Sequence, residues 1–361
     1  MPGSSAGLGG SLSSRHILTT DAIKDRASEL GFNLCGVAPA AAFPELGFFK
    51  EWIARGYAGT MGYLPRSAER RSDVRNVMPS ARSVVMVAAL YNSGGPYSTE
   101  RRDCSASEVA RYARSRDYHD VMGERLDGFV AWMKERSGDG FEARAYVDTG
   151  PVQERVFAQY AGLGWIGKNA CVINAELGSW LLLGVVLCSA DLECDAPATD
   201  QCGTCTLCLE ACPTGAFVAP HELDATKCIS YLTIEYRGSI PDVHRDRIGN
   251  HVFGCDVCQE VCPWNGSPLT TSDPSWSARA DVNAQRLVQL WRHSDAELAR
   301  FIGDTAMTRA GIRGLRRNLA VALGNSGDPD ARTALEEIRT DETIGEPIVA
   351  EHVQWALRKL T

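Results

Sequence analysis

The stretch CGTCTLCLEACPTGAF, residues 202–217, places four cysteines within eleven residues and follows the last of them with a proline. Downstream, CDVCQEVCPWN, residues 255–265, adds three more cysteines and a second Cys-Pro end. The spacing CxxCxxCxxxCP is typical of bacterial segments that hold [4Fe-4S] clusters and send their last cysteine across to a second cluster. The two stretches therefore predict an iron–sulfur unit in this part of the chain.

With Cys228, which precedes the second stretch, there are eight cysteines, enough for two clusters with four thiolates each. By the crossing rule, one cluster is held by Cys202, Cys205, Cys208 and Cys262, and the other by Cys212, Cys228, Cys255 and Cys258. Zinc is the alternative, because CxxC pairs also suit tetrahedral thiolate sites. A zinc site does not need the CxxCxxCxxxCP spacing, so the pattern favours iron and sulfur.

Length and composition set coarse limits on the rest of the chain. The 361 residues suffice for two or three domains, and 44% hydrophobic with 23% charged residues is an ordinary globular balance. A net charge of -8 argues against global attraction to nucleic acid but leaves room for local basic patches. The Gly/Ser-rich start predicts a disordered tail rather than a secretion signal, and the apolar run 180–188 is too short to span a membrane. We therefore expect a cytoplasmic protein.

The segments on either side of the cysteines differ in their patterns. The N-terminal part reads as mixed α/β, with strands predicted at 83–90, 141–147 and 178–187 and helices at 22–30, 118–136 and 152–161. The C-terminal part, 282–361, reads as helical, with a helix–turn–helix at 311–338 and a further helix at 352–360. Stacked helical hairpins of this kind indicate HEAT-like repeats.

Several motifs in order carry a resemblance to a known family. They are ERRSDVRNVMP (69–79), RYARSRDYHDVM (111–122), YVDTGPVQER (146–155), GWIGKN (164–169), the two cysteine stretches and KCISYLTIEYRG (227–238). Together they resemble the epoxyqueuosine reductases, which are related to reductive dehalogenases. The resemblance implies an oxidoreductase that uses cobalamin and two [4Fe-4S] clusters to convert epoxyqueuosine to queuosine in tRNA, the last step of queuosine biosynthesis.

The resemblance also implies roles for particular residues. Electrons from the clusters would form cob(I)alamin, and Asp148 of VDTGP would be the general acid for the departing epoxide oxygen. Against an apolar corrin, its pKa would be raised. The alternative is that Asp148 caps the next turn or helix. No protein histidine is expected on the cobalt, and His119 is interpreted as a helix-start residue. The candidate cobalamin contacts are Arg71, Arg111, Asp148, Lys168, Asn169, Ser179 and Ser230.

The substrate tRNA needs a basic surface. Four arginines lie at positions i, i+4, i+7 and i+8, on one helical face, and predict a phosphate-binding patch: Arg309, Arg313, Arg316 and Arg317. Ordinary solvation of these side chains is the alternative. The epoxyqueuosine base lies in an anticodon loop, from which it can be splayed out into a pocket. An external electron donor is implied, and we expect a monomer.

The predicted architecture is α+β in three domains. After a disordered tail, 1–14, come a cobalamin-binding catalytic α/β domain, 15–190, a bacterial-ferredoxin-like two-cluster domain, 191–275, and a HEAT-like α-helical repeat domain, 276–361. Two other functions stay open: a cytoplasmic reductive dehalogenase acting on a small substrate, and an electron-transfer module on a helical scaffold. The module leaves the long N-terminal part without a role.

Overall fold

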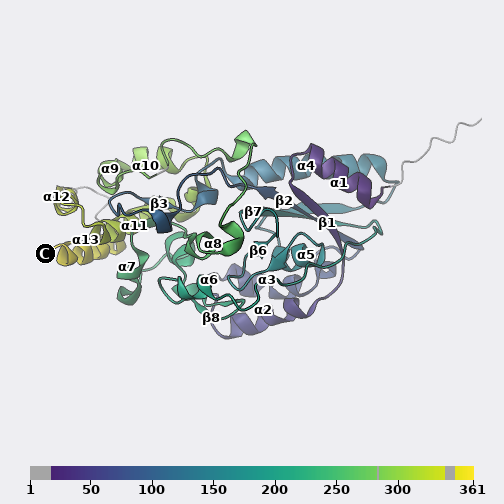
Figure 1. Cartoon of the computed structure of the whole chain (residues 1–361), viewed down its shortest axis with the longest axis horizontal. Helices are drawn as coiled ribbons and strands as arrows, with labels where there is room; N and C mark the ends of the chain where they lie inside the picture. The colour runs from purple at the N-terminus through teal and green to yellow at the C-terminus, as the bar shows by residue number, and fades with distance from the viewer. Residues whose placement is uncertain (1–17, 283, 338–345) are drawn as a thin grey trace, which may run out of the picture.

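The computed structural model describes residues 18–282, 284–337 and 346–361. The elongated molecule runs from a sheet-containing N-terminal part through the cysteine-rich segment to a helical C-terminal part (Figure 1). The predicted tail, 1–14, lies outside the described residues. Within the described ranges, no helix is long and apolar enough to cross a membrane.

A four-stranded antiparallel sheet forms the core of the N-terminal part. Its order is β1-β2-β7-β4, with bounds Leu34–Pro39, Ser83–Leu90, Leu181–Cys188 and Ala143–Tyr146. The predicted strand 83–90 is confirmed. The strands predicted at 141–147 and 178–187 form with ends shifted by one to three residues.

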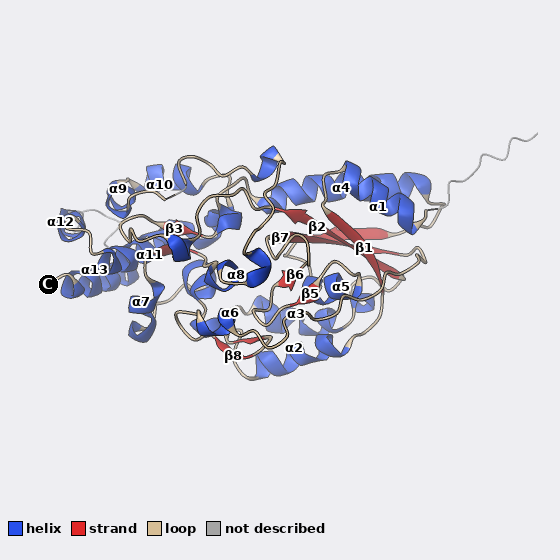
Figure 2. Ribbon diagram, viewed as in Figure 1, coloured by secondary structure: helices blue, strands red, loops and turns tan. Residues whose placement is uncertain are grey.

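Helices cover both faces of this sheet (Figure 2). Every residue of β2 is buried, and its side chains alternate between two cores. Val85 and Val87 pack in a core with α1 and α4, whereas Val84 and Met86 pack in a core with α2 and α5. The helices on the two faces are α1 (Thr20–Glu29), α4 (Tyr118–Arg136), α2 (Pro44–Ala54), α3 (Tyr63–Ser72) and α5 (Glu154–Tyr160). The helix predicted at 118–136 is confirmed.

A small hairpin, β5 (Trp165–Ile166) with β6 (Val172–Ile173), carries the GWIGKN motif. The segment GLGWIG, residues 162–167, overlaps this motif and has the GxGxxG spacing of dinucleotide-binding loops. It leads into the hairpin and not into a helix, so it does not form such a loop. Gly164 is required by packing, since a Cβ there would lie 2.3 Å from the carbonyl oxygen of Ile173.

The cysteine-rich segment is built from very short elements. It contains α6 (Leu207–Glu210), β8 (Phe217–Ala219), β9 (Glu222–Leu223), a π-helix (Tyr231–Glu235), α7 (Asp242–Ile248), β10 (His251–Phe253) and α8 (Val257–Glu260). Strand β10 pairs in parallel with β3 (Glu108–Val109), which joins this segment to the N-terminal part.

The described C-terminal part is helical, as predicted. Its helices are α9 (Leu287–Arg292), α10 (Asp295–Ile302), α11 (Gly311–Ser326), α12 (Ala331–Glu337) and α13 (Pro347–Lys359). The predicted 311–338 pair forms around Gly327 in the left-handed conformation, and residue 338 lies outside the described part. The long helix α11 lies inside a core shared with α9, α12, α13 and β10.

Candidate functional site

The fold brings the cysteines together in two groups. Four thiols line one cavity and repel one another as thiolates: Cys202, Cys205, Cys208 and Cys262. Burial and the neighbouring thiolates raise the pKa of Cys208 to about 11. In the second group, burial and the charges of Cys255 and Cys212 raise the pKa of Cys228 to about 11. The interaction with Cys171, burial, and the charges of Cys255 and Cys228 raise the pKa of Cys258. A cationic iron centre would relieve this repulsion.

The geometry of the thiols bears on the choice between iron and zinc. Among residues 18–282, 284–337 and 346–361, no three Cys, His, Asp or Glu side chains form a group that could hold a single metal ion. A zinc site needs its sulfurs about 2.3 Å from one ion. The four thiols of the first group line a cavity together with Ile173 and Trp264, and such a donor set suits a multi-iron cluster.

The GWIGKN hairpin lies against both cysteine groups. Lys168 Nζ donates hydrogen bonds to the carbonyl oxygens of Gly203 and Cys205, at 2.7 and 2.8 Å. Asn169 Nδ2 donates to the carbonyl oxygen of Cys258 at 3.1 Å. The structure therefore places these two predicted cobalamin contacts beside the cysteines, where they fix the backbone of both groups.

Asp148 follows β4 with its side chain 66% exposed. It does not cap α5, whose N-cap is Gln153, so the alternative of a cap on the next helix is wrong. Its carboxylate Oδ2 lies 3.5 Å from His119 Nε2, and His119 Nδ1 lies 2.8 Å from Asp117 Oδ1. The Tyr118 side chain also acts on the Asp148 carboxylate and lowers its pKa. Asp117, His119 and Asp148 thus form a row of acid–base groups from the start of α4 to the end of β4.

The charges at Asp148 differ from the expectation. The interaction with the His119 ring holds the pKa of Asp148 below its ordinary value, whereas we expected a raised pKa. Correspondingly, the hydrogen bond to Asp117 and the pairing with Asp148 raise the pKa of His119 to about 9. At neutral pH the shared proton therefore lies on His119. Since carboxylates face both of its ring nitrogens, His119 is no candidate for an axial ligand of cobalt.

Sequence reasoning missed several neighbours of Asp148. His119 is a helix-start residue, as interpreted, because it is the second residue of α4 and Asp117 is the N-cap. The interpretation missed that its side chain turns back to Asp117 and also faces Asp148. Tyr63 is 39% exposed, and the Arg309 guanidinium lies 5.9 Å from its ring centre. The charges of Glu235 and Asp148 both act on the Tyr63 hydroxyl, which places it near the exposed carboxylate. No spacing rule along the chain could have identified Tyr63.

Three further predicted cobalamin contacts lie in different settings. Arg71 is partly buried and donates to Ser67 Oγ at 3.0 Å and to the Val152 carbonyl oxygen at 2.9 Å, next to the Asp148 segment. Ser179 is buried, and its hydroxyl donates to Gln259 at 3.0 Å. Ser230 is partly buried and immediately precedes the π-helix. Of the three, Arg71 lies closest to the Asp148 chemistry.

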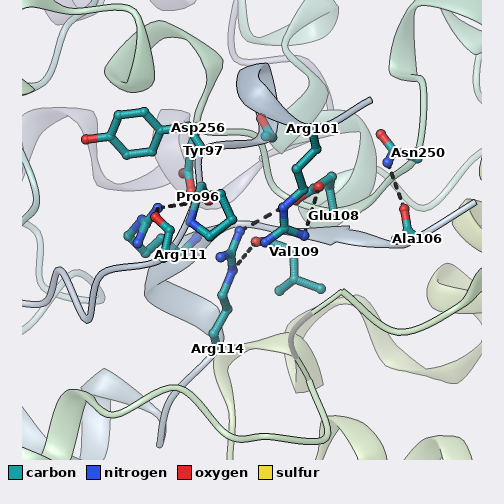
Figure 3. Close-up of polar contacts among 12 residues, drawn as sticks. Pro96, Tyr97, Arg101, Ala106, Glu108, Val109, Arg111, Arg114, Asn250 and Asp256 are labelled. Carbon is teal, nitrogen blue, oxygen red and sulfur yellow. Dashed lines mark hydrogen bonds and ion pairs between the residues drawn. The ribbon is translucent and has the colours of Figure 1, made fainter. Parts of the chain in front are cut away.

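Arg111 is deeply buried and occupied by internal partners (Figure 3). Its guanidinium donates to Asn92 Oδ1 at 3.1 Å and to the Gly95 and Pro96 carbonyl oxygens, between the rings of Tyr97 and Trp180. Its backbone N–H donates to Asp256, which lies between two cysteines of the second group. This burial does not fit direct contact with a cofactor. The prediction that Arg111 contacts cobalamin is therefore corrected: its side chain stabilises the fold through internal hydrogen bonds.

The predicted arginine face does not exist as such. Arg316 and Arg317 are 1% and 2% exposed, because α11 is surrounded by other elements. Arg317 donates to the carbonyl oxygens of Leu232, Tyr236 and Gly238, and Arg316 to that of Trp291. Neither side chain is available to phosphate.

The other two arginines of the predicted face are at the surface. Arg309 lies before α11, in a 3-10 turn (Ala306–Ala310), and pairs with Glu235 at 2.8 Å. Arg313 lies on α11 and pairs with Glu346 at 3.3 Å. Only these two arginines of the four can reach a ligand.

Two family models match the chain. Residues 201–265 match a "4Fe-4S double cluster binding domain", and residues 71–149 match "Epoxyqueuosine reductase QueG, DUF1730". The chain is 41% identical to an epoxyqueuosine reductase of Xanthomonas campestris, over 93% of this chain and 94% of that protein. It is 44% identical to one of Gloeobacter violaceus, over 86% of this chain and 97% of that protein.

Solved structures agree with these relatives. A crystal structure of an epoxyqueuosine reductase with an epoxyqueuosine-modified tRNA stem loop superimposes with a TM-score of 0.84 at 30% identity, covering 94% of this chain and 89% of that one. A structure of the Bacillus subtilis enzyme, described as having its catalytic aspartate loop swung out of the active site, matches with a TM-score of 0.82 at 30% identity, covering 94% of this chain and 90% of that one.

Proposed function

Because the chain belongs to the epoxyqueuosine reductase family, we propose that it removes the epoxide oxygen of epoxyqueuosine in tRNA and so completes queuosine biosynthesis. The reaction consumes two electrons and two protons and yields an alkene and water. Its cofactors are cobalamin and two [4Fe-4S] clusters. When bound, the clusters relay single electrons from an external donor, and cobalamin supplies the low-potential cobalt that acts on the epoxide.

The proposed proton donation by this protein's own residues rests on the pairing of His119 with Asp148. The exposed carboxylate of Asp148 is in contact with His119, whose raised pKa keeps a proton at this point at neutral pH. We infer that His119 and Asp148 act together, so that the proton stored on the ring passes through Asp148 to the departing oxygen. Tyr118 helps to orient the carboxylate.

The eight cysteines are the proposed cluster ligands, in the two groups described above. Lys168 and Asn169 would hold the backbone around them. For cobalamin, Arg71 and Ser230 remain the proposed contacts, together with Ser179 as a buried support.

For tRNA, the proposed contacts are Arg309 and Arg313, which are about half exposed. A phosphate group would compete with Glu235 and Glu346 for them. Tyr63, beside Arg309, offers an aromatic face for a base of the unpaired anticodon loop. The relative solved with a modified stem loop supports tRNA as the substrate. We further propose a monomer, with domain boundaries near residues 191 and 276 and HEAT-like packing of the last domain.

The test uses anaerobically purified full-length protein. Iron, cobalt and zinc are quantified, and epoxyqueuosine stem loop is then supplied with cobalamin and a strong reductant. About eight irons per chain and cobalamin-dependent formation of queuosine are expected. Zinc in place of iron would refute the redox role. A full complement of iron with no queuosine formed would refute the tRNA substrate and favour a dehalogenase acting on a small molecule.

A further inference from the structure

The segment between β4 and α5, residues 148–151, is an irregular turn whose first residue has an unfavourable backbone conformation. Asp148 has φ +55, a region that residues other than glycine seldom occupy. Its side chain is largely exposed, so packing of that side chain does not hold the backbone in place. Such a conformation persists only where surrounding contacts impose it. The contacts of this segment therefore decide where the Asp148 carboxylate points.

The backbone contact at Asp148 comes from the helix that follows. Glu154, in the first turn of α5, accepts a hydrogen bond on Oε1 from the Asp148 backbone N–H at 2.8 Å. At the far end of the segment, Arg71 Nη1 donates to the Val152 carbonyl oxygen at 2.9 Å. Gln153 Nε2 donates to the Arg71 carbonyl oxygen at 3.0 Å. The segment is thus fastened at both ends, and at its Asp148 end by the Glu154 side chain.

The Glu154 side chain suits this role because its acceptor oxygen does not need a charge. Burial, followed by the negative charge of Asp148, raises its pKa to about 8. A protonated carboxyl still offers a carbonyl oxygen to the Asp148 N–H, and a neutral group avoids repelling the carboxylate of Asp148. A side chain without an acceptor would leave that N–H without this partner.

We propose that Glu154 is a positioning residue that holds the Asp148 segment in the conformation in which the carboxylate meets His119. This inference rests on the proposed role of Asp148 as proton donor. Without the Glu154 acceptor, the left-handed conformation of Asp148 loses its backbone contact, and the carboxylate spends less time at His119. Turnover would fall because a catalytic group displaced by about 1 Å costs up to about a hundredfold in rate.

The experiment compares Glu154→Leu, which removes the acceptor at similar size, with Glu154→Gln, which keeps a carbonyl oxygen. The matched control is Glu45→Leu. Glu45 is also partly buried and also contacts α5, accepting from the Tyr160 hydroxyl at 3.1 Å, but it does not touch the Asp148 segment. Each full-length variant is assayed for iron content, for kcat and KM with the epoxyqueuosine stem loop, and for hydrogen–deuterium exchange of a peptide covering 147–153.

We expect Glu154→Leu to lower kcat about tenfold or more with KM and iron content near wild type, and to speed exchange in that peptide. The kcat of Glu154→Gln should stay within about twofold of the wild-type value, and the kcat of Glu45→Leu should equal the wild-type value. A Leu variant with unchanged kcat and exchange would overturn the proposal, and so would a Gln variant as impaired as the Leu variant. If wild type itself fails to turn over, the proposed function fails, whereas the exchange comparison still tests the Glu154 contact.

Discussion

Turnover should depend on a proton held by His119, and this dependence is visible in the pH profile. The raised pKa of about 9 means that the ring is charged at neutral pH and loses its proton as the pH rises through about 9. A group with a raised pKa in the folded state also stabilises the protein fully below its ordinary value of 6.5, and this contribution disappears as the pH passes about 9. Turnover and stability therefore change in the same direction: both decrease as the pH rises through about 9.

The magnitude follows from the shift and the exposure. At 1.36 kcal/mol per pKa unit, the rise from 6.5 to about 9 corresponds to at most about 3–4 kcal/mol. Because the ring is 35% exposed, solvent screening reduces this to about 1–2 kcal/mol of stability. For catalysis, removing one positioned proton donor typically costs about 10²–10⁴-fold in rate.

The assay is single-turnover formation of queuosine from the stem loop under anaerobic conditions, from pH 6 to pH 10. Wild type should lose about tenfold in rate per pH unit above about 9. His119→Gln should lower the rate about a hundredfold or more and abolish this alkaline limb. His293→Gln, at a partly exposed histidine near Glu297, is the control and should keep the wild-type profile. A wild-type rate that stays constant from pH 8 to pH 10, or a His119→Gln profile with the same alkaline limb, would refute the reasoning.

Three further outcomes are expected. Asp148→Asn should lower turnover by about 10³-fold or more while iron content stays at the wild-type level; residual turnover within tenfold would remove Asp148 from the proton path. Cys205→Ser should reduce the iron content by about half, measured colorimetrically, and an unchanged content would remove Cys205 from the ligand set. Arg317→Ala should lower the free energy of unfolding, measured in urea, by about 3–5 kcal/mol, because the buried carbonyl groups that it contacts lose their donor. Arg313→Ala should leave the free energy of unfolding within about 0.5 kcal/mol of wild type and weaken stem-loop binding in a salt-dependent manner.

Much of the local structure can be predicted from short stretches of the sequence. The cysteine spacing needs no long-range information, because only two residues separate each of Cys202, Cys205 and Cys208 from the next and their thiols therefore lie near one another. The continuous apolar run of β2 predicts a strand buried on both faces, and the periodic apolar residues of α4 predict its full length. Motif resemblance identified Asp148, although it did not identify the groups around it.

Other features follow only from how the elements pack. The helical spacing of Arg313, Arg316 and Arg317 says which side chains lie near one another, but it does not say which side faces water. Since α11 is enclosed on several sides, its arginines satisfy internal carbonyl groups in place of phosphates. Arg111 is buried for the same reason, between rings and carbonyls of segments distant in sequence.

The acid–base site shows the same division. The sequence by itself determined the redox unit, several helices and strands of the parts that flank it, and the identity of one carboxylate. The tertiary structure alone decided that the start of α4 meets the end of β4, so that His119 lowers the pKa of Asp148 where an apolar neighbour would raise it. A pKa depends on distances of a few ångströms between groups far apart along the chain, and those distances exist only in the folded protein.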